Sequence, residues 1–201
     1  MKLFHSPTSP YVRKVRVTVR EKGLTGKVED VAVNSMEDGT PLLAHNPLSK
    51  VPTLLLDDGT ALFDSPVICE YLDAQAANPV LIPAKGPERW EVLRHQAMTD
   101  GLMDAAFAYV MELRREESER SAMWMARWLG AINRCVDVLE AEIGQLGGAV
   151  TLAHIGAGCA LGYLDLRYTG IVDWRRDHPA LATWYAGFAE RPSMQETVPP
   201  G

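Results

Sequence analysis

The sequence has few cysteines, and none of them lie close together. Cys69, Cys135 and Cys159 are the three present, so their number is odd and they form no Cys-x-x-Cys pair. A disulfide framework needs paired cysteines, and small secreted domains use them densely. We therefore expect free thiols and a cytoplasmic protein in a reducing environment.

The sequence also lacks an excess of basic residues and any long apolar run. Twenty Lys and Arg against 26 Asp and Glu give a net charge of −6, which repels phosphate backbones. No run reaches the roughly 18 apolar residues that a spanning helix needs, and no basic segment with a long apolar core begins the chain. His5, His45, His95 and His178 have no metal-ligand spacing. We expect no nucleic acid, no membrane and no metal.

What is present is the composition of a globular protein, with 47% hydrophobic and 23% charged residues. Strand-like runs occur only in residues 1–77, and residues 89–201 carry apolar side chains at helical spacing. The strand-like runs are residues 2–5, residues 28–33 and a hairpin over 53–63 that turns at Asp58-Gly59. Prolines and a glycine in residues 78–88 indicate a linker. The pattern predicts an α/β N-terminal domain (1–77) and an all-α C-terminal domain (89–201).

Residues 10–22 are ambiguous, because their valines fit both the alternation of a strand and one face of a helix. The boundaries favour a helix. Ser9 is a good N-cap before Pro10, and Lys22 is followed by Gly23, a residue typical of the position after a helix. Three arginines of this helix are expected on its solvated face: Arg13, Arg16 and Arg20.

A second helix begins in the same way, at Asp64-Ser65-Pro66, where Ser65 is the expected cap. Four motifs, in this order, are similar to those of the cytosolic glutathione S-transferase superfamily and in particular to its bacterial serine-type members. They are SPTSPYVRKVRV, NPLSKVPTL, FDSPVICEYL and TLAHIGAGCALGYLDLR. The resemblance covers nearly the whole chain and implies a thioredoxin-like N-terminal domain, a helical C-terminal domain, glutathione as co-substrate and a homodimer.

The resemblance implies that glutathione lies along Val51, Pro52, Asp64 and Ser65. In the family this proline is cis, which costs an X-Pro bond only about 0.5–1 kcal/mol, and the bend turns the main chain of Val51 outward to pair with the cysteinyl residue. The γ-glutamyl carboxylate would bind Ser65 at the helix N-terminus, and Asp64 would receive the ammonium group. Taken alone, Val51-Pro52 is equally an ordinary turn proline, and Asp64-Ser65-Pro66 is more often only a helix cap.

Ser9 occupies the position at which redox-active classes carry cysteine and conjugating or isomerising classes carry serine. A hydroxyl cannot form a mixed disulfide, so thiol transfer is not expected. It can donate a hydrogen bond to the glutathione sulfur and so favour the thiolate of a group whose free pKa is about 8.5. Thr8 is the nearest substitute donor, and Tyr11 would line the same pocket. The expected function is a glutathione transferase acting on an electrophilic small molecule.

Two other functions stay open: a glutathione-dependent isomerase, dehalogenase or peroxidase, and a non-catalytic interaction protein of the same fold. By resemblance, Asp100 would reach the γ-glutamyl amine bound to the partner subunit. Met103 and Phe107 would wall the pocket for the electrophile, whereas Tyr163 is expected in the core.

The fourth motif departs from the family in one position. Its helix should begin with a capping box, in which a Ser or Thr is followed three residues later by an acidic residue. Here Thr151 is followed by His154. We expect a less complete cap, at a cost of about 0.5–2 kcal/mol in stability.

Overall fold

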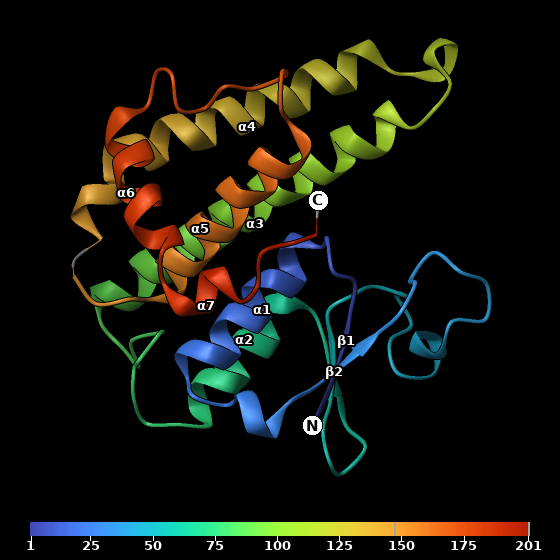
Figure 1. Ribbon diagram of the computed structural model, residues 1–201, viewed down its shortest axis with the longest axis vertical. Coiled ribbons are helices and arrows are strands. Elements are labelled where there is room, and N and C mark those ends of the chain that lie inside the picture. The colour runs from blue at the N-terminus through green and yellow to red at the C-terminus, as the bar shows by residue number, and fades with distance from the viewer. Residues whose placement is uncertain (147, 201) are drawn as a thin grey trace.

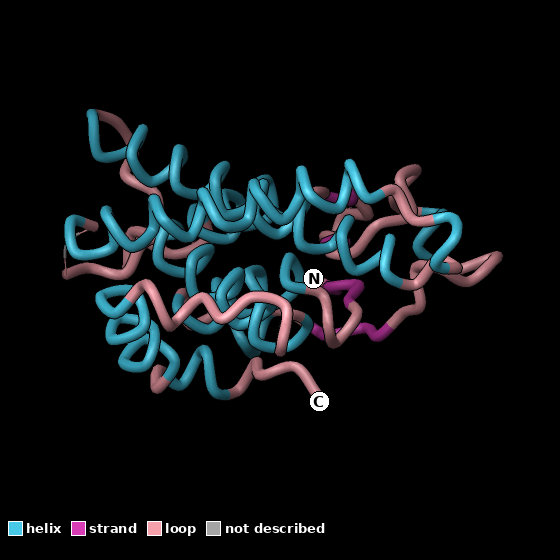
Figure 2. Tube along the Cα trace, turned by 90° about the horizontal axis from the view of Figure 1, so that it is seen from above, coloured by secondary structure: helices cyan, strands magenta, loops and turns pink. Residues whose placement is uncertain are grey.

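The computed structural model describes residues 1–146 and 148–200, so Gly147 and Gly201 of the predicted helical domain lie outside the described residues. Its strands lie on one side of the molecule, and helices make up the rest (Figures 1 and 2). This arrangement confirms the predicted α/β and all-α architecture, while the boundaries of the linker stay a prediction. Within the described residues, no helix is long and apolar enough to cross a membrane.

The sheet has four strands in the order β2-β1-β3-β4. Their bounds are β1 Lys2–His5, β2 Glu29–Ala32, β3 Thr53–Leu55 and β4 Ala61–Leu62. β1 runs parallel to β2 and antiparallel to β3, and β3 and β4 form the predicted hairpin. Gly59 in its turn has a φ of 88°, a conformation that favours glycine.

The helices fall into two groups (Figure 1). Their bounds are α1 Pro10–Glu21, α2 Ser65–Ala74, α3 Pro87–Leu113, α4 Ala122–Glu142, α5 Leu152–Arg167, α6 Pro179–Ala189 and α7 Pro192–Gln195. α1 and α2 pack beside the sheet, and the others form the helical domain, in which α3 to α6 lie above them and α7 lies beside α1. The predicted helix over residues 10–22 is confirmed, with Ser9 at its N-cap and Gly23, φ 65°, directly after it.

α1 connects the two parts of the molecule. It crosses from β1 to β2, and its buried Val15 lies in one core with Leu3 and Leu54 of the sheet and Ile155 of α5. On its other side, the fully buried Lys14 forms an ion pair with Asp100 of α3.

Arg13 is buried against the helical domain, so its predicted solvated position is wrong. Its side chain is only 7% exposed, and its Nη2 donates to the carbonyl oxygen of Met194 in α7 at 3.2 Å. A Cβ atom at Gly162 of α5 would lie 2.3 Å from Nη1 of Arg13. The guanidinium therefore fills the space that a glycine leaves on α5, at the junction of α1, α5 and α7.

α3 and α5 approach closely at Gly156. A Cβ atom at this position would lie 2.4 Å from Oγ1 of Thr99, which is fully buried on α3. The absence of a side chain thus sets the spacing of the two helices, as small residues do wherever helix backbones come close. The same two helices carry the side chains of one wall of the site described below.

The capping box of α5 is complete, and the expectation of a weaker cap is wrong. The backbone N–H of Thr151 donates to Nδ1 of His154 at 3.1 Å, and the Thr151 hydroxyl lies 2.9 Å from the same nitrogen. The unprotonated imidazole nitrogen accepts the hydrogen bond that a carboxylate accepts in the usual box.

Candidate functional site

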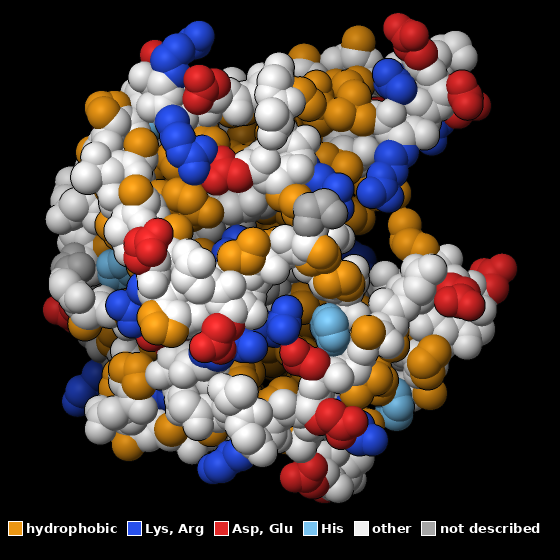
Figure 3. Space-filling model, viewed as in Figure 1, with side chains coloured by type: hydrophobic (Ala, Val, Ile, Leu, Met, Phe, Trp, Pro, Cys, Tyr) orange, Lys and Arg blue, Asp and Glu red, His pale blue; other side chains and the backbone are white. Residues whose placement is uncertain are grey.

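A cavity of about 850 Å³ lies between the N-terminal domain and helices α3 and α5. All six site residues predicted from the sequence line this cavity: Ser9, Tyr11, Val51, Pro52, Asp64 and Ser65. Its size is typical of small-molecule sites. In the space-filling view the cavity opens at the notch between two parts of the molecule: the projecting end of α3 with the beginning of α4, and the loop after β2. Lys and Arg side chains gather at this notch (Figure 3).

Ser9 stands at the N-terminus of α1 and is partly exposed to the cavity. Its oxygen accepts a hydrogen bond from the backbone N–H of Val12 at 3.3 Å, which makes it a side-chain cap. No acceptor for its own proton lies within hydrogen-bonding distance among residues 1–146 and 148–200. A hydroxyl can accept and donate at once, so this proton is available to a ligand. Thr8 lines the cavity beside it.

The main chain of Val51 is open to the cavity. The Val51–Pro52 bond is cis, which confirms the conformation implied by the family resemblance. Within the described part of the chain, neither the N–H nor the carbonyl group of Val51 has a hydrogen-bond partner. Unpaired donor and acceptor groups next to the beginning of β3 can pair with an extended peptide as an added strand would.

Asp64 and Ser65 begin α2 at the cavity wall. Asp64 occupies the N-cap position and Ser65 is the first helical residue, so the predicted cap at Ser65 is wrong by one residue. The difference places both the backbone N–H and the hydroxyl of Ser65 in the first turn, where helix donors have no partner within the helix. Ser65 is only 2% exposed, and its hydroxyl has no hydrogen-bond partner among the described residues. An anion would satisfy these groups.

Tyr11 also lines the cavity, but its phenol is already engaged. The hydroxyl donates to Oδ1 of Asp104 on α3 at 2.5 Å. Burial, reinforced by this hydrogen bond, raises the pKa of Tyr11 far above its ordinary value. Tyr11 therefore stays protonated and bound to Asp104, and it is poorly placed to stabilise a thiolate.

The helical wall of the cavity differs in part from the expectation. Phe107 lines it and is 44% exposed, and Tyr163 lines it although it is buried as expected. Met103 is instead fully buried in the core. Asp100 forms an ion pair with the buried Lys14 of the same chain, and its expected contact with glutathione bound to the partner subunit stays a prediction.

Four charged lining residues were not found from the sequence: Lys50, Asp104, Arg114 and Arg167. Asp104, Phe107, Met111 and Arg114 follow one another at steps of three, four and three residues. This spacing places Asp104 and Arg114 on the face of α3 that carries Phe107. That periodicity was the available signal. Charged residues on a helix are most often solvated, however, and only the position of the N-terminal domain identifies this face as a cavity wall.

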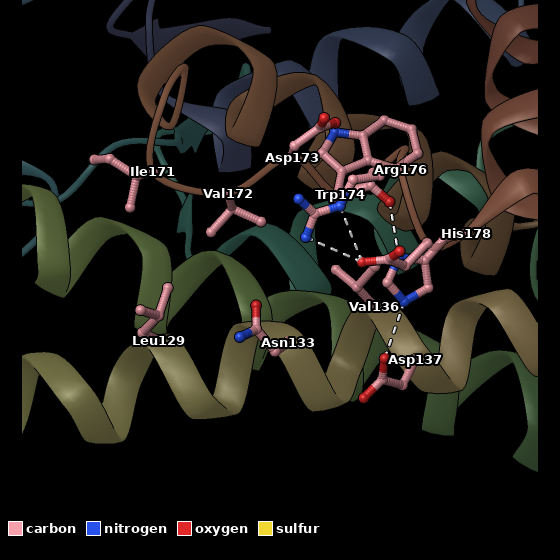
Figure 4. A pocket seen from close by; sticks show the side chains of 11 residues that line it. Leu129, Asn133, Val136, Asp137, Ile171, Val172, Asp173, Trp174, Arg176 and His178 are labelled. Carbon is pink, nitrogen blue, oxygen red and sulfur yellow. Dashed lines mark hydrogen bonds and ion pairs between the residues drawn. The ribbon is translucent and has the colours of Figure 1, made fainter.

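A second, smaller cavity of about 330 Å³ lies between α4 and residues 171–178 (Figure 4). Its main polar groups pair with one another: Nε2 of His178 lies 2.9 Å from Asp137, and Nδ1 lies 2.7 Å from the carbonyl oxygen of Trp174. These contacts tie the segment to α4. Among the described residues, no group of three or more His, Cys, Asp or Glu side chains could hold a metal ion in either cavity.

Comparison with known protein families matches both parts of the chain. Residues 8–75 match the glutathione S-transferase N-terminal domain, and residues 122–187 match the glutathione S-transferase C-terminal domain. The uncharacterized GST-like protein YibF of Escherichia coli K12 is 36% identical over 203 residues, which cover 100% of this chain and 99% of that protein. The maleylacetoacetate isomerase of Pseudomonas aeruginosa is 30% identical over 160 residues, 74% of this chain and 73% of that protein.

Solved structures agree with this assignment. A glutathione transferase family member from Pseudomonas fluorescens Pf-5, solved with bound glutathione, has a TM-score of 0.94 and 43% identity, with 100% of this chain and 99% of that chain covered. Its structure with bound S-(propanoic acid)-glutathione has a TM-score of 0.90 and covers 100% of both chains. Both the fold and the sequence therefore place this chain in the glutathione S-transferase family.

Proposed function

We propose that this protein is a glutathione transferase that joins the sulfur of glutathione to an electrophilic small molecule. One observation carries the proposal: unpartnered groups of Ser9, Val51 and Ser65 meet in a single cavity. Each suits a different part of the tripeptide. The bound glutathione of the Pseudomonas fluorescens relative, whose sequence is 43% identical, supports the same ligand here.

The proposed binding mode follows from the chemistry of the three groups. The γ-glutamyl carboxylate accepts hydrogen bonds from the hydroxyl and N–H of Ser65, and its ammonium group faces Asp64. The cysteinyl residue pairs with the free N–H and carbonyl of Val51 beside Pro52. This pairing directs the thiol toward Ser9, with Thr8 and Tyr11 as neighbours in the wall.

Ser9 supplies the activation in this proposal. Its free proton forms a hydrogen bond to the sulfur, and the N-terminus of α1 adds a partial positive charge. Both stabilise the thiolate more than the thiol, so the pKa falls from about 8.5 toward the working pH. The thiolate then uses its electron pair to form a carbon–sulfur bond, and the leaving group departs with the electrons of its own bond to carbon.

A glutathione-dependent isomerase is the second candidate. The likeness to the Pseudomonas aeruginosa maleylacetoacetate isomerase favours it, because the alignment covers about three quarters of both chains. An isomerase returns glutathione unchanged, whereas a transferase consumes one equivalent for each product. Mass spectrometry and thiol titration with aryl halide, peroxide and maleyl substrates therefore separate these reactions.

The test of the proposal combines binding and turnover. Calorimetry should show glutathione binding to the wild type and weaker binding to Ser65→Ala, since that variant loses a donor to the carboxylate. Ser121→Ala is the matched control, because Ser121 caps α4 away from the cavity. Absence of binding at millimolar glutathione would refute the proposal, and binding without turnover of any substrate would favour an interaction protein. The homodimer and the cytoplasmic location stay predictions; light scattering tests the former.

A further inference from the structure

Two arginines without carboxylate partners line the cavity. Arg114 follows the last residue of α3, and Arg167 is the last residue of α5. Within the described residues, neither guanidinium has a carboxylate oxygen within 4.0 Å. Arg167 lies near Tyr163 and opposes the rise that burial causes in the pKa of that phenol, and Nη1 of Arg114 lies 3.8 Å from the sulfur of Met111. Both keep donors available in a fork geometry that suits a carboxylate.

Several other arginines of this protein form ion pairs with carboxylates. Arg175 contacts Asp165 through two nitrogens at 2.5 and 2.7 Å, and Arg191 contacts Glu21 at 2.8 and 3.0 Å. With 26 acidic residues in a chain of net charge −6, carboxylate partners are plentiful. Among the described residues Arg13, Arg120, Arg127 and Arg134 also have no carboxylate within 4.0 Å, so what distinguishes Arg114 and Arg167 is that they line the cavity.

The α3 wall of the cavity is polarised, while Lys50 lines the cavity beside Val51. Asp104, bound to the hydroxyl of Tyr11, lies ten residues before Arg114, which is a distance of about 15 Å along the helix. Phe107 and Met111 lie between them on the same face and line the cavity. The acidic end thus belongs to the wall near α1, and the basic end lies beyond an apolar stretch. A ligand that spans the cavity meets cations at its far end.

We propose that the electrophile carries a carboxylate, which Arg114 and Arg167 bind while its apolar part contacts Phe107. This inference names the substrate class of the site and rests on the proposed transferase function. Arg114 contacts the anion from the end of α3 and Arg167 contacts it from the end of α5, and the reactive carbon then faces the sulfur near Ser9. A neutral analogue of the same shape gains no such contact.

A matched pair of aryl halides tests the inference: chloronitrobenzoate and chloronitrobenzamide, which differ only in the carboxylate. In both reactions the glutathione sulfur forms the new bond to the ring and chloride leaves with the bonding electrons. After correction for the uncatalysed rates, kcat/KM for the benzoate should exceed that for the amide by about tenfold or more, because charge-assisted hydrogen bonds are the stronger ones.

Variants assign the effect to the arginines. Arg114→Gln and Arg167→Gln should each lower kcat/KM for the benzoate by about tenfold and leave the amide nearly unchanged. Arg115→Gln is the control, since Arg115 is the next residue along the chain, contacts Glu119 and does not line the cavity. The KM for glutathione should not change in any of them. A rise in that KM would assign the guanidiniums to glutathione itself and overturn the inference.

Calorimetry of preformed conjugates gives a readout without turnover. The wild type should bind the carboxyaryl glutathione more tightly than the carboxamide conjugate, and the double variant should bind both equally. Equal binding by the wild type, or equal turnover of the two halides, refutes the anionic substrate while the transferase function stands. Preferential binding of the carboxyl conjugate without any turnover upholds the subsite and refutes the transferase function.

Discussion

Gly156→Ala should destabilise the protein by placing a methyl group where α3 and α5 are already in contact. The added Cβ would lie 2.4 Å from Oγ1 of Thr99, well inside van der Waals contact. Thr99 cannot move away easily, because it is fully buried and its hydroxyl donates to the carbonyl oxygens of His95 and Gln96 at 3.0 and 3.1 Å. Overpacking of this kind costs about 1–3 kcal/mol.

The expected loss can be measured by thermal unfolding. For a chain of this length each kcal/mol shifts Tm by about 2–4 °C, so a cost near 2 kcal/mol lowers Tm by about 4–8 °C. Because α3 and α5 carry Phe107 and Tyr163, we also expect a higher KM for the electrophile. Glutathione binding, which relies on the N-terminal domain, should change less.

Two further variants make this prediction refutable. Thr99→Ala removes the clashing oxygen, so the double variant with Gly156→Ala should recover most of the lost stability, as a double-mutant cycle would show. Gly101→Ala on α3 is the matched control, since no atom lies within 4 Å of the added Cβ, and it should gain about 0.5–1 kcal/mol. Equal Tm shifts for Gly156→Ala and Gly101→Ala would contradict the reasoning.

Two charge contacts should give opposite pH dependences. Burial alone would lower the pKa of His178, but hydrogen bonds to Asp137 and a backbone carbonyl raise it above 6.5. Asp137→Asn should therefore cost up to about 1 kcal/mol below that pH and little once the pH exceeds the raised value. Burial would raise the pKa of Glu21, but donors from Arg191 and Ser193 lower it below 4.5. Glu21→Gln should cost about 1.5–3 kcal/mol at neutral pH and progressively less in acid.

Urea unfolding over a pH series measures both effects. Asp38→Asn and Glu116→Gln are the controls, since both side chains are exposed and no cation lies within 4.0 Å of them in the described part of the chain. A loss in Asp137→Asn that persists in alkali would show that the contact is not electrostatic. If the loss of stability in Glu21→Gln stays constant as the pH falls into the acid range, the loss comes from packing and not from charge.

Local signals in the sequence were sufficient for the elements that carry the proposed glutathione site. Ser9 before Pro10 marks the beginning of α1, and Gly23 marks its end, because each conformation requires particular residue types. The same reasoning located α2 within one residue. These serines and the cis bend at Pro52 are short-range features, so the sequence contains the information to find them.

Long-range contacts explain what the sequence did not reveal. Nothing in the local pattern indicates that Lys14 is fully buried, because its cost is offset only by Asp100 on a helix that is 86 residues away. Arg13 is buried for the same reason, through its contact with Met194. Arg114 and Arg167 line one cavity only when α3 and α5 pack side by side. Positions that depend on docking of helices need the structure.

The pKa of the bound glutathione thiol tests the central claim most directly. It can be followed by the ultraviolet absorbance of the thiolate in a pH titration of the complex. We expect a value below 8.5 in the wild type and about one unit or more higher in Ser9→Ala, with glutathione still bound. Ser121→Ala loses a comparable helix cap, in which Ser121 accepts from Trp124 at 3.4 Å, and should leave the pKa unchanged. The same pKa in the wild type and in Ser9→Ala would contradict the role proposed for Ser9.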